Sequence, residues 1–424
     1  MRRRAFIGGL GAAAAGAALG ACSGPDSASR GGDADFFIDA PTWGTGLRRA
    51  GERLRAVTGT GLAPQSIPTT SSYEQVIKSQ LQTRNPPDLI KWGSGYRMQD
   101  LARTGTLAPL DAQWARAEKR GWLDPALRSR FTYRGRVYGL PLQNGYYVML
   151  YNKKLFARLG LSEPTTWDAF THVLETLKRH GTTPIGTTQV NAWPAAIWFG
   201  ELASKTDPDW YRRVTMGRAS YTDAAPRRMM RMWQSMIRAG YHTSPDRSFD
   251  DFPALLKEGG IAMYAAAVSW TTQSLEAAGM RPTTDFGAFL LPTVSAGTER
   301  TVISEAAGIT AAARASGRRQ SLELLDHWLD PDVQRPWSSF LWGSSANPTL
   351  PWQEPASRRI QREVAGGRLR VLNRYWEASP PALVEGNVQD LGGFMADPSD
   401  PDGVLESMQS RARTEWEYWK KETS

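Results

Sequence analysis

The stretch FFIDAPTWGTG (residues 36–46) begins the pattern from which the fold is predicted. Its first five residues have the length and composition of a buried strand, and a glycine-containing turn follows them. The same alternation of short apolar runs and amphipathic stretches continues with a helix over residues 47–57, a strand over 62–67, a helix over 71–81 and a strand over 88–92. A βαβαβ order of this kind favours a mostly parallel sheet with helices on both of its faces.

Two loops of nearly the same sequence follow predicted strands, WGTG (43–46) after the first and WGSG (92–95) after the third, and WGSS (342–345) is a later version. In open α/β sheets, ligands bind beyond the carboxyl ends of the strands. Glycine lets the backbone approach a ligand, and an indole offers a flat apolar face. The alternative is three ordinary glycine turns above packed tryptophans. The candidate ligand-binding residues from these loops are Trp43, Gly44, Trp92, Gly93 and Trp342.

The N-terminal residues have the features of an export signal that ends in a lipidation site. Arg3 and Arg4 precede Phe-Ile, which is typical of the twin-arginine route, and LGAC (19–22) resembles a bacterial lipobox. We therefore predict that residues 1–21 are a signal peptide cleaved before Cys22, and that residues 22–34 form a flexible linker anchored by a lipid on Cys22. The alternative is a membrane span, but the apolar segment is shorter than the ~20 residues that a span needs.

Length, charge and cysteine content limit the remaining possibilities. About 400 residues remain after the predicted cleavage, which is long for one hydrophobic core and favours two lobes. Cys22 is the only cysteine, so the chain forms no internal disulfide. The net charge of +9 falls to +6 without Arg2, Arg3 and Arg4, and the other basic residues are scattered, so we expect no nucleic-acid partner.

Several short stretches, taken in order, resemble one known family. They are NPPDLI (85–90), GTLAPLD (105–111), YGLP (138–141), LYNKKLF (150–156), PTTWD (164–168), EGGIAM (258–263) and DFG (285–287). Together they resemble the solute-binding lipoproteins of carbohydrate ABC importers, the extracellular family related to maltose-binding protein. The resemblance implies a hinged, two-lobed α/β fold of the periplasmic-binding-protein-like class II, with a ligand cleft between the lobes.

The resemblance also implies where the chain crosses between lobes. We expect crossings near residues 142–146, 288–291 and 330–332. The first lobe would then comprise residues 35–142 plus 292–330. The second would comprise residues 143–291 plus 331–424.

By the same resemblance, residues from both lobes clamp the ligand. Trp43 and Trp92 would serve the first lobe, and an aromatic residue after the strand near residue 261 would stack on the ligand from the second. Carboxylates and amides would pair with ligand hydroxyl groups, because a buried hydroxyl without a partner costs roughly 1–3 kcal/mol. The further candidates are Asn144, Asn191, Trp193, Trp270 and Glu305. Ordinary structural roles remain open for Asn144 and Glu305, as a turn residue and a solvated carboxylate.

The function implied is capture of a mono- or oligosaccharide outside the cytoplasmic membrane and its delivery to the permease subunits of an ABC transporter. We expect a monomer, lipid-anchored to the outer face of the bacterial membrane, with no catalytic residue, cofactor or metal. The four histidines lack metal-ligand spacing, and no phosphate-binding loop or Gly-x-Ser-x-Gly motif is present. Two alternatives are a glycoside hydrolase, which needs two carboxylates, and a receptor that signals to a membrane sensor. Whether the ligand is charged also stays open.

Overall fold

The computed structural model of the protein describes residues 32–190, 193–342 and 345–423. Within these ranges a nine-stranded sheet has the order β2-β1-β3-β10-β6-β8-β7, with β11 beside β10 and β9 beside β6. The predicted βαβαβ start is confirmed, because β1 pairs in parallel with both β2 and β3. Its elements are β1 (Ala34–Ile38), α1 (Gly44–Thr58), β2 (Leu62–Ser66), α2 (Thr70–Gln80) and β3 (Leu89–Trp92).

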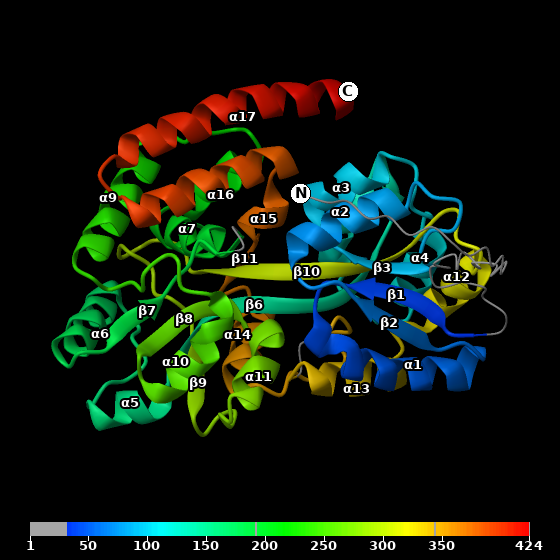
Figure 1. Ribbon diagram of the computed structural model, residues 1–424, viewed down its shortest axis with the longest axis horizontal. Helices are drawn as coiled ribbons and strands as arrows, with labels where there is room; N and C mark the ends of the chain where they lie inside the picture. The colour runs from blue at the N-terminus through cyan, green and yellow to red at the C-terminus, as the bar shows by residue number, and fades with distance from the viewer. Residues whose placement is uncertain (1–31, 191–192, 343–344, 424) are drawn as a thin grey trace, which may run out of the picture.

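Two long strands join the halves of the molecule (Figure 1). Strand β6 (Leu140–Asn152) pairs antiparallel with β10 (Thr301–Ala311), and farther along with β8 (Ile261–Ala267) and β9 (Phe286–Phe289). Strand β10 pairs at one end with β3 and at the other with β11 (Arg370–Asn373). Both strands therefore belong to both lobes, and the sheet is continuous through the hinge.

The first lobe surrounds one hydrophobic core, whose members lie between residues 34 and 142 and between residues 306 and 346. Figure 1 shows α2 above its strands, and α1 with α13 below them. Its other elements are η1 (Pro41–Trp43), α3 (Gly95–Ala102), α4 (Asp111–Lys119), η2 (Pro125–Phe131), β4 (Thr132–Tyr133), β5 (Arg136–Val137), α12 (Arg318–His327) and α13 (Pro331–Phe340).

The second lobe has two adjoining cores, whose members lie between residues 146 and 303 and between residues 352 and 412. Strands β8 and β9 belong to it. Its other elements are α5 (Lys153–Arg158), α6 (Trp167–Arg179), β7 (Thr183–Gly186), α7 (Trp193–Thr206), α8 (Pro208–Val214), α9 (Ala224–Arg238), η3 (Phe249–Asp251), α10 (Phe252–Glu258), α11 (Val268–Ala277), α14 (Pro355–Ala365), α15 (Tyr375–Ala378), α16 (Pro381–Ala396) and α17 (Pro401–Thr423).

Two of the predicted crossings lie too early in the sequence. Ile303 still packs in the second lobe, so the chain crosses within β10 and not near residues 288–291. Val333 and Trp337 pack in the core of the first lobe, because Asp330 caps the amphipathic helix α13, which lies against α1. The chain therefore returns to the second lobe after residue 346, and not near residues 330–332.

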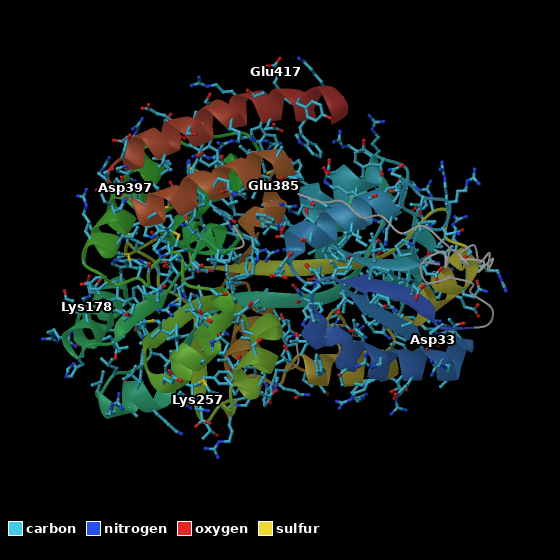
Figure 2. The ribbon with its side chains drawn as sticks, in the orientation of Figure 1. Asp33, Lys178, Lys257, Glu385, Asp397 and Glu417 are labelled. Carbon is cyan, nitrogen blue, oxygen red and sulfur yellow. The ribbon has the colours of Figure 1, made fainter. Side chains whose placement is uncertain are left out.

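Charged side chains are distributed over the outside of both lobes. Figure 2 labels Lys178, Lys257 and Asp397 at the periphery of the second lobe and Asp33 at the edge of the first. None of the helices in the described ranges is long and apolar enough to cross a membrane.

His242 is a half-buried titratable group in the second lobe, and its Nε2 atom is shielded from solvent. Its Nδ1 lies 3.3 Å from the Thr187 hydroxyl, and the edge of its ring meets Trp198, with the ring centroids 5.4 Å apart. Nε2 has no hydrogen-bond partner. Burial therefore lowers the pKa of His242 to about 3, so the folded protein holds this ring neutral.

This shift predicts a pH-dependent loss of stability. Between its ordinary pKa of 6.5 and about 3, the unfolded chain binds a proton that the folded protein does not. The free energy of unfolding should therefore fall with decreasing pH, by up to about 1.4 kcal/mol per pH unit for one such group. Urea unfolding at several pH values should show a shallower dependence of the unfolding free energy on pH for His242→Gln than for the unsubstituted protein. An unchanged slope in His242→Gln would contradict the assignment.

Candidate functional site

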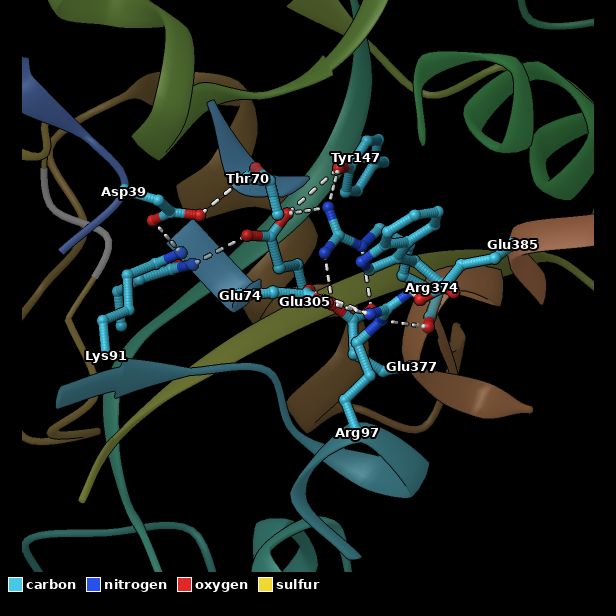
Figure 3. A network of polar contacts seen from close by, with 12 residues as sticks. Asp39, Thr70, Glu74, Lys91, Arg97, Tyr147, Glu305, Arg374, Glu377 and Glu385 are labelled. Carbon is cyan, nitrogen blue, oxygen red and sulfur yellow. Dashed lines mark hydrogen bonds and ion pairs between the residues drawn. The ribbon is translucent and has the colours of Figure 1, made fainter. Parts of the chain in front are cut away.

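A cleft lies between the lobes, beyond the carboxyl ends of β1 and β3 (Figure 3), and its unfilled space, open solvent included, is about 610 Å³. Parallel strands bring their following loops to one edge of the sheet, and the hinge strands place side chains of the second lobe opposite them. The first lobe contributes Asp39, Thr70, Tyr73, Glu74, Lys91, Trp92, Gly93 and Arg97. The hinge and second lobe contribute Tyr147, Trp193, Glu305, Ala307, Arg374, Trp376 and Glu377.

Glu305 lies on β10 at the hinge, and its carboxylate is buried. It accepts hydrogen bonds from Gln143 Nε2 (3.3 Å), Tyr147 Oη (3.0 Å) and Arg374 (2.9 Å). Arg374 also forms an ion pair with Glu377, with Nε 2.8 Å from Oε2. Burial alone would lower the pKa of Arg374, but Glu305 and Glu377 outweigh it and hold that pKa well above its ordinary value. Arg374 is therefore a fixed cation that positions two carboxylates.

Arg97 connects the lobes at the mouth of the cleft. Its NH1 is 2.8 Å from both oxygens of Glu74, in the first lobe. Its NH2 reaches Glu385 of α16 at 3.2 Å, and its Nε donates to the Trp376 carbonyl oxygen at 3.2 Å, both in the second lobe. The guanidinium carbon also lies 3.9 Å from the centre of the Trp376 ring. All three nitrogens are engaged, so this contact requires the lobes to be close together.

A second ion pair lies deeper in the first lobe. Lys91, at the end of β3, is 2.5 Å from Asp39, which follows β1, because these strands are neighbours in parallel register. The Thr70 hydroxyl is 3.3 Å from the other oxygen of Asp39.

Burial raises the pKa of Glu74, whereas the charge of Arg97 opposes this shift and the charge of Glu385 adds to it. The walls of the cleft are thus carboxylates held by cations, with indole rings between them.

Four of the predicted residues line this cleft. Trp92 ends β3, where its Nε1 donates to the Arg97 carbonyl oxygen at 3.0 Å, and Gly93 follows it. Trp193 begins α7 and is half-buried, and Glu305 lies at the hinge. The structure therefore brings together one WGSG loop, one indole of the second lobe and one hinge carboxylate.

Two predicted residues of the first loop lie elsewhere. Trp43 is fully buried, and its ring meets Trp337 edge-to-face with centroids 5.3 Å apart, because η1 turns the indole into the core. Gly44 begins α1 and does not line the cleft. The prediction that this loop contacts the ligand is therefore wrong in this structure.

Asn144 and Trp342 are also outside the cleft. Side chains alternate along β6, so Tyr147 lines the cleft while Asn144 accepts a hydrogen bond from Ser304 Oγ (2.9 Å) and lines a separate cavity with Trp352. Trp342 follows α13 with a φ of 57°, and its carbonyl oxygen accepts from the Glu354 amide at 3.2 Å. Asn191, the side chain of Trp270 and Cys22 lie outside the described residues.

Sequence reasoning missed most of the charged residues. A lysine within a buried strand and an aspartate at the end of another were available signals for Lys91 and Asp39. Arg374 and Trp376 follow β11, near the end of the chain, and no local pattern places them at the cleft. The missed residues are Asp39, Thr70, Tyr73, Glu74, Lys91, Arg97, Tyr147, Ala307, Arg374, Trp376 and Glu377.

Across the described ranges, no group of three or more acidic, histidine or cysteine side chains could hold a metal ion.

The C-terminal helix makes a further contact between the lobes. Tyr96 of α3 meets Trp416 and Trp419 of α17, both edge-to-face, with centroids 5.4 and 5.2 Å apart. Arg103, at the end of α3, contacts Tyr418 of α17. These contacts lie away from the cleft lining, so they favour the closed arrangement without occupying the ligand space.

The backbone of Gly95 lies close to the backbone of the second lobe, and this contact generates a prediction. Its φ is 60°, and a Cβ there would lie 2.2 Å from the Glu377 carbonyl oxygen in the second lobe. Gly95→Ala should therefore hinder closure and weaken ligand binding at least about tenfold, or 1.4 kcal/mol, in a titration.

Gly105→Ala is the matched control. Gly105 has a similar φ of 71°, but a Cβ there meets no atom within 4 Å. Both variants should lose about 1 kcal/mol of stability to backbone strain, since alanine disfavours positive φ. Equal affinity in the two variants would show that the closed contact at Gly95 does not matter for binding.

Comparison with known proteins agrees with this geometry. Residues 39–335 match the family model described as bacterial extracellular solute-binding protein. The chain is 25% identical over 228 residues to an uncharacterized ABC transporter extracellular-binding protein of Pyrococcus horikoshii, covering 52% of this chain and 51% of that protein. It is 26% identical over 174 residues to an alpha-glucosides-binding periplasmic protein of Rhizobium meliloti, covering 37% of each. The chain thus spans about half, or less, of the length of these curated relatives.

Solved structures resemble the whole described fold. A bacterial solute receptor described as having an exclusive preference for β-D-galactopyranose superposes with a TM-score of 0.79 at 19% identity, covering 91% of this chain and 99% of that one. A chitin oligosaccharide binding protein gives a TM-score of 0.78, also at 19% identity and with the same coverage. At such identities the likeness concerns the fold alone, and it confirms the predicted hinged, two-lobed α/β class.

Proposed function

Because the chain belongs to the bacterial extracellular solute-binding protein family, we propose that it captures a sugar between its lobes outside the cytoplasmic membrane and delivers it unchanged to an ABC permease. The observation that carries this proposal is the cleft itself. Indole faces and hydrogen-bonding carboxylates from both lobes converge there. The sugar ligands named for relatives and structural neighbours support the same ligand class.

The chemistry of the cleft suits a polyhydroxylated ring. Trp193 and Trp376 are half-buried at the cleft, where Trp193 offers an apolar face and Trp376 offers the face that Arg97 does not cover. Covering roughly 60 Å² of a sugar face at ~25 cal/mol/Å² contributes about 1.5 kcal/mol, which gives affinity with little selectivity. Asp39 and Glu305 face the same space and accept hydrogen bonds, so they would select the orientation of ligand hydroxyl groups.

Lobe closure is the signal that the permease would read. A ligand that contacts both lobes shifts the population toward the closed form by its differential affinity for that form. Arg97 and Tyr96 already join the lobes through contacts of the protein itself. The bound sugar then adds the stabilisation that makes closure depend on ligand.

We extend the proposal to location and assembly. Export by the twin-arginine route, cleavage before Cys22 and lipidation of Cys22 would hold a monomer at the outer face of the membrane, beside its permease. Two acyl chains on one cysteine are about what stable anchoring requires.

Calorimetric titration of the purified protein against mono- and oligosaccharides tests the function. We expect micromolar binding or tighter, which corresponds to at least about 8 kcal/mol. Reducing ends should not accumulate during prolonged incubation with oligosaccharides. Release of reducing ends would favour the hydrolase alternative, and the absence of heat with every sugar would contradict the proposal.

A pair of tryptophan variants tests which indole contacts the sugar. Trp376→Ala should weaken binding at least about tenfold and change the melting temperature little, because the ring is half-buried at the cleft. Trp43→Ala should instead lose about 3–5 kcal/mol of unfolding free energy and keep the affinity of the folded protein, because that ring is core. If Trp43→Ala weakens binding as much as Trp376→Ala, the assignment of the two rings is wrong.

Cys22→Ala tests the anchor. The variant should move from the membrane fraction to the soluble extracytoplasmic fraction and should no longer incorporate labelled fatty acid. Ser23→Ala, one residue farther on, should remain in the membrane fraction and incorporate the fatty acid, as the protein of unchanged sequence does. Continued fatty-acid labelling of Cys22→Ala would rule out this cysteine as the lipid site.

A further inference from the structure

The charges around the cleft are unequal in number. Three cations, Lys91, Arg97 and Arg374, lie among five carboxylates, each within ion-pair distance of one of these cations. Figure 3 shows this network. The carboxylates are Asp39, Glu74, Glu305, Glu377 and Glu385. Glu385 does not line the cleft, so by formal charge the seven groups that do line it carry an excess of one negative charge.

Both guanidinium groups are fully engaged by the protein. Every nitrogen of Arg97 has a partner in Glu74, Glu385 or the Trp376 carbonyl group. Every nitrogen of Arg374 has a partner in Glu305, Glu377 or the Tyr147 hydroxyl group. A ligand carboxylate or phosphate would have to displace one of these acids and leave it buried without its counter-charge, which is costly.

Another cation near the hinge, Arg130, lies outside the cleft lining, as Glu385 does, and its charge interacts with Glu377. The guanidinium of Arg130 donates to Ser304 Oγ at 3.1 Å, and neither residue lines the cleft. Lys91 is 2.5 Å from Asp39, so its charge is also balanced by the protein.

The hydrogen-bonding capacity that remains for a ligand is mainly that of acceptors. An ionised carboxylate offers about four lone-pair sites. Asp39, for example, accepts from Lys91 and Thr70, which leaves sites toward the cleft that it lines. A hydroxyl group can use them, and an ammonium group can use them with three donors and a positive charge. The indole face of Trp193, and the face of Trp376 that Arg97 does not cover, also favour a cation over an anion.

We infer that the cleft selects its sugar by charge: it excludes anionic sugars such as uronates and sugar phosphates, and it favours a ring that carries a protonated amine over the neutral sugar of the same configuration. This inference rests on the proposed function and names the ligand class of the same site.

The test is a set of calorimetric titrations of the purified protein near pH 6, where the amine is protonated and the uronate is ionised. Each set contains a neutral sugar, its 2-amino derivative and its uronate, in the gluco and galacto series. The amino sugar should bind at least about threefold tighter than the neutral sugar, and the uronate at least about tenfold weaker. A uronate that matches the neutral sugar, or an amino sugar that binds no tighter, overturns the charge selection while sugar binding stands. Absence of heat with all of these sugars and their oligomers counts against the proposed function itself.

Glu385→Gln provides a second readout. Figure 2 shows Glu385 on α16, on the side of the second lobe that faces the first, and its side chain is 52% exposed. Removing its charge should narrow the affinity ratio of amino sugar to uronate at least about threefold, whereas a mere change in closure alters all three affinities together. Glu417→Gln, on the outer helix α17, is the matched control and should leave the ratio unchanged. An unaltered ratio in Glu385→Gln argues against charge selection by this carboxylate.

Discussion

The closed arrangement depends on one buried guanidinium group. Arg97 is almost fully buried, and it joins Glu74 in its own lobe to Glu385 and Trp376 in the other. A buried cation without these partners would be costly, so separating the lobes must expose Arg97 to water or leave part of its hydrogen-bonding capacity unused. α15 and α16 pack in the core of the second lobe, and the Arg97 contact holds them, with Trp376, against the first lobe at the cleft.

The hinge strands decide which side chains a ligand can meet. Strand β10 pairs with β6 so that Glu305 lies opposite Gly145, with Tyr147 two residues farther along the same face. Asn144 is adjacent in sequence but lies on the other face, because the side chains of a strand alternate. A glycine opposite Glu305 also leaves room for the Gln143 amide, whose hydrogen bond keeps the carboxylate in place.

Local patterns predicted the fold well and the site only in part. The periodicities of residues 36–92 depend on near neighbours, and the structure has the predicted order of strands and helices there. The two WGxG loops show where such reasoning ends. Their sequences are nearly identical, yet Trp92 lines the cleft while Trp43 is covered by Trp337, which lies almost 300 residues later. Arg374 reaches Glu305 across 69 residues of sequence, and no local spacing encodes this contact.

The last helix, α17, contacts both lobes through different parts of its length. Trp416, Tyr418 and Trp419 contact α3 of the opposite lobe, whereas Leu405 and Met408 hold the start of the same helix in the core of the second lobe. Proteolytic trimming of the final turns would therefore leave both lobes folded and remove a contact that holds them together. Loss of about ten residues would give a receptor that is intact by every measure of folding and yet opens more readily, releasing its cargo sooner.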